Sequence, residues 1–169
     1  VVGQSFLTFL PVHYAREGYS LVSVGLLVAL FTLAGTLSGL LAGHFSDRIG
    51  YKPVFLVAHG LMTPVLLLFL HLSGKWIYPG AFLAGFFVLA SLPLGVVMAQ
   101  ELVPRGRSMV SSLMMGLAYG LGGVVTPLVG RAADLFSIRQ VLLAISFIPL
   151  VTVLLILLFP EPARSAADR

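Results

Sequence analysis

The residues that could do chemistry in this sequence are polar side chains set within long apolar stretches. Gln4 and Thr8 lie four positions apart, so in a helix they would share one face and could hydrogen-bond a polar ligand. Histidine in general titrates near neutral pH, so His13 could carry a proton, but it lies about half a turn away from Gln4 unless Pro11 bends the helix. The alternatives are hydrogen bonds to a neighbouring helix for Gln4 and Thr8, and contact with interfacial water for His13.

A second set of candidates recurs at helical spacing and comprises Phe87, Ser91, Leu94, Met98 and Glu101. An aromatic and polar stripe of this kind would suit an amphipathic ligand, with Phe87 and Ser91 as the contact residues. The alternative is a packing surface between helices. Both interpretations remain open from the sequence.

Two pairs of opposite charges stand close together in the chain. Glu101 and Arg105 are four residues apart, a spacing at which helical side chains form ion pairs. We expect a structural pair there, with Glu101 as a proton carrier as the alternative. Arg131 and Asp134 are three residues apart, and we expect a solvated ion pair, with an extracellular gate as the alternative.

Several other chemistries are excluded. The sequence has no Cys, so disulfides and thiolate catalysis are absent. Its four His are scattered without matching carboxylates, which predicts no metal site. Ser38 lacks the glycine two residues earlier that a Gly-x-Ser-Gly intramembrane protease site would need. The sequence therefore predicts neither an enzyme nor a cofactor.

The composition is that of a membrane protein. Of 169 residues, 59% are hydrophobic and 9% are charged, whereas a soluble domain carries roughly 25% charged residues. A soluble domain of this size could not bury so much apolar surface, and disorder is excluded by the same hydrophobicity. The net charge of +4 comes from thinly spread basic residues, which do not form a nucleic-acid groove.

Long charge-free stretches predict six transmembrane helices. Five stretches reach the roughly 20 residues that a spanning helix needs, and the first falls short where the chain begins. The two-residue alternation of barrel strands is missing. The predicted domain is an all-α bundle over residues 1–160, followed by a cytoplasmic tail over residues 161–169. The helices are expected at about residues 1–16, 19–45, 53–73, 77–100, 108–132 and 139–159.

The distribution of basic residues gives an orientation. Six lie on the side of the C-terminus and four on the opposite side, and the richer side is expected to be cytoplasmic. For a bacterial protein this means a multi-pass protein of the cell inner membrane with a cytoplasmic C-terminus. The six are Arg48, Lys52, Arg105, Arg107, Arg164 and Arg169, and the four are Arg16, Lys75, Arg131 and Arg139.

Glycines line one side of two predicted helices. Gly35 and Gly39 lie on the second helix, and Gly116, Gly120 and Gly123 lie on the fifth. Small residues at about four-residue spacing let membrane helices pack closely. We expect both stripes to be packing faces, which could also slide against a neighbouring helix.

The segment from Gly43 to Lys52 is the most specific motif. Gly43 would allow close helix packing, Asp47 would accept backbone N–H groups at a helix start, and Gly50 would permit a turn closed to other residues. Arg48 and Lys52 would anchor the loop at the cytoplasmic surface. The alternative is an unrelated tight loop with an acidic cap and basic anchors.

This segment resembles the signature loop of the major facilitator superfamily, with Tyr51 standing where a basic residue is usual. The Gly-x-x-x-Asp pattern that begins at Gly43 returns at Gly130, 87 residues later. That offset spans three predicted helices, so the copies would be inverted in the membrane, as in the nested repeats of this superfamily. The resemblance implies two inverted three-helix repeats that form one six-helix half of a twelve-helix transporter. The Pro-Glu-Pro segment after the last helix favours the C-terminal half, with the N-terminal half as its partner.

Three further segments resemble the fosmidomycin-resistance branch of these efflux proteins: Ala99–Pro104, Met109–Ser112 and Gly116–Gly123. This resemblance implies a drug–proton antiporter that exports a small polar or amphipathic compound by alternating access and confers antibiotic resistance. It also implies that the first and fourth helices face the substrate cavity. The alternatives are an uptake, sugar or metabolite transporter of another branch, and a six-helix channel or non-transporting membrane protein.

Overall fold

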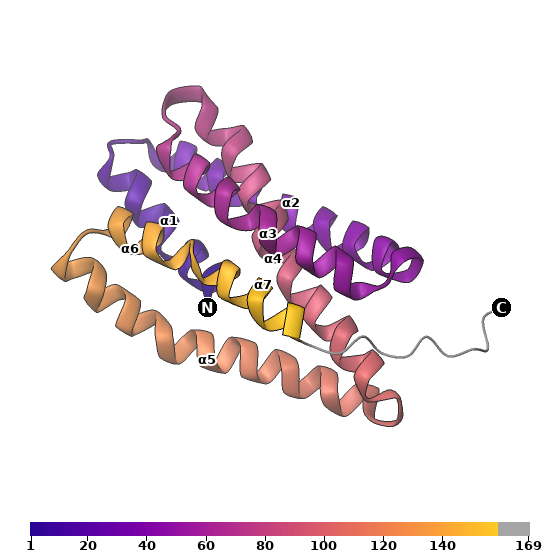
Figure 1. Cartoon of the computed structure of the whole chain (residues 1–169). Helices are drawn as coiled ribbons and strands as arrows, with labels where there is room; N and C mark the ends of the chain where they lie inside the picture. Colours follow the sequence, from indigo (N-terminus) through magenta and orange to yellow (C-terminus); the bar gives the residue numbers. More distant parts are fainter. Residues whose placement is uncertain (159–169) are drawn as a thin grey trace.

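The computed structural model describes residues 1–158, apart from the side chain of Pro104, and every regular element within them is helical. Short turns join successive long helices, so neighbours in sequence run in opposite directions (Figure 1). The α-helices are α1 (Val2–Arg16), α2 (Leu21–Ile49), α3 (Tyr51–His71), α4 (Ile77–Leu102), α5 (Arg107–Leu135), α6 (Ile138–Ile145) and α7 (Ile148–Leu158), and the 3-10 turns are η1 (Gly74–Trp76) and η2 (Pro104–Gly106).

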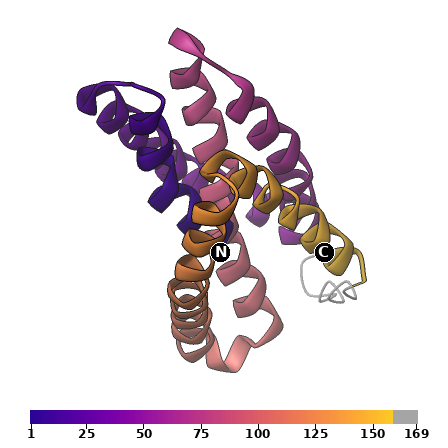
Figure 2. The same ribbon diagram turned by 90° about the vertical axis from the view of Figure 1, so that its left-hand side faces the viewer.

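The bundle is built around α4. This helix lies against α2 along much of its length and also contacts α3 and α5, while α7 packs on α3. The α1 helix contacts α2, α5 and α6. In Figure 2 the α5 helix and the α6–α7 segment diverge from their shared turn, which leaves α5 at the edge of the molecule.

Glycines allow α2 and α4 to approach each other closely. A Cβ atom at Gly85 would lie 2.7 Å from the Cα atom of Phe31 and even nearer to its carbonyl oxygen. A Cβ atom at Gly35 would lie 2.5 Å from the Cβ atom of Leu89. Among the described glycines, Gly85 alone has the backbone of another helix within 3 Å of its Cβ position, at the fully buried Phe31. The α2 and α4 helices therefore approach each other most closely there.

The main core forms where α1, α2, α3 and α4 meet, and it extends to α5 and α6. Its members are fully or almost fully buried large side chains and small alanines. Because lipid is as apolar as these side chains, their close fit, rather than removal from water, stabilises the bundle in a membrane. The largest fully buried members are Phe6, Leu10, Leu27, Phe31, Met62, Leu66, Phe69, Ile77 and Leu142.

The structure differs in two ways from the six transmembrane helices that the sequence predicts. Five segments are long and apolar enough to cross a membrane, and α1 is shorter, with 15 residues and a length of about 22 Å. The predicted helix at 139–159 is interrupted between α6 and α7 at Ser146 and Phe147. Pro149 explains this break, because it has no N–H group to bond to the carbonyl of Ile145 and its ring clashes there.

The predicted loop between the second and third helices is almost absent. The α2 helix continues to Ile49 rather than ending near residue 45, and α3 starts at Tyr51 rather than at 53. Gly50 alone makes the reversal, with φ 87° and ψ 158°. The predicted end of the last helix at residue 159 and the tail at 161–169 lie outside the described residues.

The α2–α4 contact predicts how a single methyl group would act. We expect Gly85→Ala to destabilise the protein by about 1–3 kcal/mol, because the added Cβ forces the two helices apart. Thermal unfolding of the purified protein in detergent measures this loss.

The matched control for this substitution is Gly25→Ala on α2, where nothing lies within 4 Å of the added Cβ. This control should leave stability unchanged or raise it by up to about 1 kcal/mol through helix propensity. Equal unfolding temperatures for the two variants would contradict the close approach of α2 and α4.

Candidate functional site

The first candidate surface lies at the start of α1. Gln4 is half-buried and faces Gly122 of α5, whose Cβ position lies 3.5 Å from the side chain of Gln4. The preceding Gly3 faces Val88 of α4 at 3.3 Å. The first turn of α1 is therefore wedged between α4 and α5, while Thr8, one turn later, is exposed.

The second candidate surface lies on α4. Phe87 and Ser91 are half-buried, and Phe87 packs partly against the main core. Its ring meets that of Phe86 edge to face, with centroids 5.5 Å apart. Farther along the stripe Leu94 is buried and Glu101 is exposed, so the stripe does not form one open wall. Packing thus accounts for part of the stripe, while Phe87 and Ser91 remain partly exposed next to Val88 and Leu89, which meet the first turn of α1.

His13 does not join Gln4 and Thr8. Although Pro11 stands before it, α1 is one continuous helix, and His13 is buried on its other side with 8% of its surface exposed. It lines a separate polar pocket of about 150 Å³ with residues of α3 and α6. The inclusion of His13 in one substrate cavity with Gln4 is therefore corrected, because half a turn of helix separates the two side chains.

The two expected ion pairs are not formed within the described residues. Glu101 and Arg105 are not paired because α4 ends at Leu102 and Val103 leaves helical geometry, with φ −130° and ψ 74°. Arg131 and Asp134 both lie on α5, and both side chains are exposed to the surroundings without an ion pair between them. The structure thus shows separate charges at the helix ends.

The two glycine stripes behave differently. Gly35 and Gly39 face α4 as predicted, against Leu89 and Pro93 respectively. On α5, however, the glycines that meet another helix are Gly122, against Gln4, and Gly130, against Phe9 at 3.3 Å. The packing glycines predicted on α5 are Gly116, Gly120 and Gly123. A Cβ atom at any of them would have no other part of the described chain within 4 Å.

The signature segment forms a tight reversal of the chain, but Asp47 does not cap the following helix as expected. Gly50 has the expected positive φ, but Asp47 lies exposed in the last turn of α2 and makes no cap, since α3 has no side-chain cap hydrogen bond. Gly43 contacts no other helix of the described chain, because nothing lies within 4 Å of its Cβ position. Arg48 is exposed, whereas Tyr51, at the position where a basic residue is usual, is buried.

One polar contact between helices was not predicted. The side-chain amide of Gln100 donates to the hydroxyl oxygen of Ser111 at 2.6 Å and so joins α4 to α5. The Ser111 hydroxyl in turn donates to the carbonyl of Arg107 at 2.7 Å. Both residues belong to segments that resemble the fosmidomycin-resistance branch, and that resemblance was the available signal for them.

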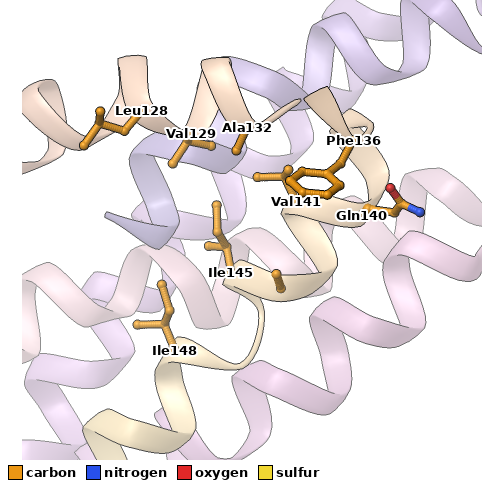
Figure 3. A pocket seen from close by; sticks show the side chains of 9 residues that line it. Leu128, Val129, Ala132, Phe136, Gln140, Val141, Ile145 and Ile148 are labelled. Carbon is orange, nitrogen blue, oxygen red and sulfur yellow. The ribbon is translucent and has the colours of Figure 1, made fainter. Parts of the chain in front are cut away.

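One wide groove is apolar. It has a volume of about 630 Å³ and lies between α5 and the α6–α7 segment. In Figure 3 Val129 and Ala132 of α5 face Val141 and Ile145 of α6 across it, with Gln140 at one end. Its lining suits hydrocarbon and offers little to a polar substrate, and none of the predicted cavity residues lines it. Among the described residues no group of three or more His, Asp or Glu could hold a metal ion.

Comparison with known proteins decides the family. The sequence profile of the Major Facilitator Superfamily matches residues 2–169. The chain belongs to this superfamily. The resemblance seen in the signature segment is thereby confirmed, and the apolar helices are those of a multi-pass membrane protein. Members of this superfamily are transporters and not enzymes.

Proteins with similar sequences include a fosmidomycin resistance protein. That protein, from Escherichia coli, is 31% identical over 154 residues, which cover 91% of this chain and 37% of the relative. An uncharacterised superfamily transporter from Bacillus subtilis, YfnC, is 30% identical over 156 residues, again 91% of this chain and 37% of the relative. The chain thus spans little more than a third of the length of these relatives. No solved structure matches it significantly.

The contact between α4 and α5 gives a second prediction. A double-mutant cycle with Gln100→Leu and Ser111→Ala should show a coupling energy of about 0.6 kcal/mol, and at most about 1.7 kcal/mol, because a hydrogen bond between membrane helices contributes that much. Unfolding of the purified protein in mixed detergent micelles measures the cycle.

Ser112→Ala is the matched control for this cycle, since the Ser112 hydroxyl bonds only to Ser108 of its own helix, at 3.1 Å. It should show no coupling with Gln100→Leu. Zero coupling between Gln100 and Ser111 would mean that the α4–α5 link is not made in the folded protein.

Proposed function

We propose that this chain is the C-terminal six-helix half of a transporter that exports a small polar or amphipathic compound, such as fosmidomycin, in exchange for protons. The observation that carries the proposal is the similarity to the fosmidomycin resistance protein over 91% of this chain. The short α1 helix then spans the membrane as well and completes the set of six, together with the five longer segments. In this arrangement the two three-helix repeats are inverted, and the C-terminus is cytoplasmic.

The substrate would bind near the middle of the membrane, between the two halves. In this half Gln4 and Thr8 of α1 would hydrogen-bond its polar groups, and Phe87 and Ser91 of α4 would contact its apolar part. The wedging of the first turn of α1 between α4 and α5 supports this location, because it brings the Gln4 end of α1 to the middle of α4. Alternating access would then expose this surface to each side of the membrane in turn.

The state of α5 supports a partner half. Of its 29 residues only Gly122, Val129 and Ala133 are buried, although the helix is apolar enough to span a membrane. We propose that the N-terminal half covers this helix, with Gly116, Gly120 and Gly123 at the contact. Small residues let helices approach closely and slide, which is the movement that alternating access needs.

The proton would be carried by the other half. Every charged residue described in this chain lies at or near a helix end, so none is placed in the middle of the membrane. Intramembrane acids are the usual proton carriers of transporters. We therefore expect the coupling acid in the N-terminal half and not at Glu101, which lies exposed at the end of α4.

A second candidate is a metabolite transporter of the same superfamily. It is favoured by a Haemophilus influenzae relative, named as a putative metabolite transport protein, that is 27% identical over 168 residues, or 96% of this chain and 41% of the relative. The same surface of α1 and α4 would then take a cellular metabolite. The direction of transport and the nature of the substrate distinguish this candidate from drug export.

Transport by the full-length protein tests the proposal. In everted membrane vesicles with an acidic lumen, added fosmidomycin should release protons from the lumen, seen as recovery of acridine orange fluorescence. Gln4→Ala and Thr8→Ala should each lower the apparent substrate affinity about two- to tenfold, since each removes one hydrogen bond. Thr152→Ala on α7 is the control, because its hydroxyl bonds only to Ile148 of its own helix, and transport should be unchanged.

Three results would overturn parts of this proposal. Recovery without substrate would indicate an uncoupled channel. Proton movement only with a metabolite that enters together with protons would favour the second candidate. Wild-type affinity in both Gln4→Ala and Thr8→Ala would remove α1 from the substrate site.

A further inference from the structure

A polar pocket lies at the end of the bundle opposite the Asp47 turn. It forms where the end of α1, the turn after α3 and the first turn of α6 meet. It does not include the candidate substrate residues on α1 and α4. The polar side chains around it are His13, Tyr14, Glu17, Tyr19, His71, Ser73 and Arg139.

The walls of this pocket are held in place by contacts within the chain. The Tyr19 hydroxyl oxygen accepts a hydrogen bond from the backbone N–H of Gly74 at 3.0 Å, which ties the α1–α2 turn to η1. The ring of Tyr14 meets those of Tyr19 and His13 edge to face, with centroids 5.4 and 5.0 Å apart. On α3, the Nδ1 atom of His71 lies 2.6 Å from the carbonyl oxygen of Leu67. The pocket is therefore preformed.

Two largely buried side chains present polar atoms to this pocket. His13 is 8% exposed and Tyr14 is 4% exposed, and no hydrogen bond joins either side chain to the described residues. Their polar atoms are not among the fully buried unpaired atoms of the described chain, which belong to Ser5, Ser46 and Thr63, so they are open to the pocket. A molecule in the pocket, whether water or a ligand, could therefore hydrogen-bond to them.

The pocket is also lined by one carboxylate and one guanidinium group that do not form an ion pair with each other. Glu17 lies just after α1 and Arg139 in the first turn of α6, both line the pocket, and no ion pair joins them in the described structure. Had they been paired, the pocket would offer no charge to a ligand. A cavity with separated charges of opposite sign is complementary to a molecule that carries both charges.

We propose that this pocket binds a small zwitterion, with its ammonium group beside Glu17, its anionic group beside Arg139, and hydrogen bonds to His13 and Tyr14. The volume of about 150 Å³ equals that of about five water molecules. It is smaller than the 300–1,000 Å³ typical of sites for drug-sized ligands. The ligand is therefore the size of an amino acid or a phosphoethanolamine group, and the site is separate from that of an exported drug.

Such a zwitterion could be dissolved in water or be the headgroup of phosphatidylethanolamine. Both sources are consistent with the place of the pocket, because it lies at the ends of apolar helices, where the membrane surface meets water. The chemistry that the pocket recognises is the same in both cases. The inference concerns binding and does not depend on whether the protein exports a drug.

Ligand-induced stabilisation of the full-length protein in detergent tests this inference. Phosphoethanolamine should raise the unfolding temperature with increasing concentration, as expected for a ligand that binds the folded state. Ethanolamine and inorganic phosphate, which each carry one of the two charges, should bind at least about tenfold more weakly. Equal stabilisation by phosphate alone, or none by phosphoethanolamine, would overturn the proposal.

Substitutions of the two charged residues locate the binding. Glu17→Gln and Arg139→Gln should each weaken the apparent affinity for phosphoethanolamine about tenfold or more. Their controls are Asp134→Asn and Arg16→Gln, which remove an exposed charge of the same sign outside the pocket and should bind as the wild type does. The unfolding temperatures without ligand show that all four variants fold. Wild-type affinity in both pocket variants would contradict the assigned site.

Nanodiscs of defined lipid separate the two sources. If the headgroup is the natural ligand, nanodiscs that contain phosphatidylethanolamine should abolish the further stabilisation by phosphoethanolamine, while phosphatidylcholine nanodiscs retain it. If a dissolved zwitterion is the ligand, phosphoethanolamine should stabilise the protein equally in both. Either result supports the pocket, and loss of stabilisation in both kinds of nanodisc would overturn it.

Discussion

The close contact between α2 and α4 is the interaction on which the rest of this structure depends. In a membrane the lipid is as apolar as the helices, so helices stay together through close packing rather than through removal from water. Gly85 on α4 and Gly35 on α2 provide that closeness, because each occupies a place where a side chain would strike the other helix. The α3 and α5 helices then pack on α4, and α1 and α7 are positioned by these in turn.

The positions of the spans could be predicted from the sequence because charge is excluded from the membrane interior. The helix ends were less predictable, since they depend on single residues. Gly50 alone reverses the chain, so Asp47 stays in a helix instead of capping the next one. Pro149 interrupts its apolar segment, whereas Pro64 and Pro93 lie inside continuous helices. Neighbouring helices and side chains can satisfy the backbone around a proline, and a single sequence does not show where they do so.

The candidate site was also hard to predict, because a single sequence does not show which helices lie next to each other in the bundle. The glycine stripes of α2 and α5 look alike in the sequence, but one meets α4 and the other meets no part of the described chain. Gln4 was found from its type and spacing, whereas its contact at Gly122 required the arrangement of α1 and α5. A pattern shows which face of a helix is unusual, and only the packing shows what that face touches.

The separation of Gln4 from His13 on one helix divides the polar chemistry of this chain into two regions. Half a turn directs Gln4 toward α5 and His13 toward α3 and α6. Because α1 is a single helix, a movement of its first turn between α4 and α5 would also move its last turn, and Glu17, which follows that turn, lines the polar pocket together with Arg139. A ligand that holds these two charges together would bind one position of α1 better than another, and such a difference in affinity is what couples two distant sites. The continuity of α1 therefore joins the polar pocket to the surface that carries Gln4 and Thr8.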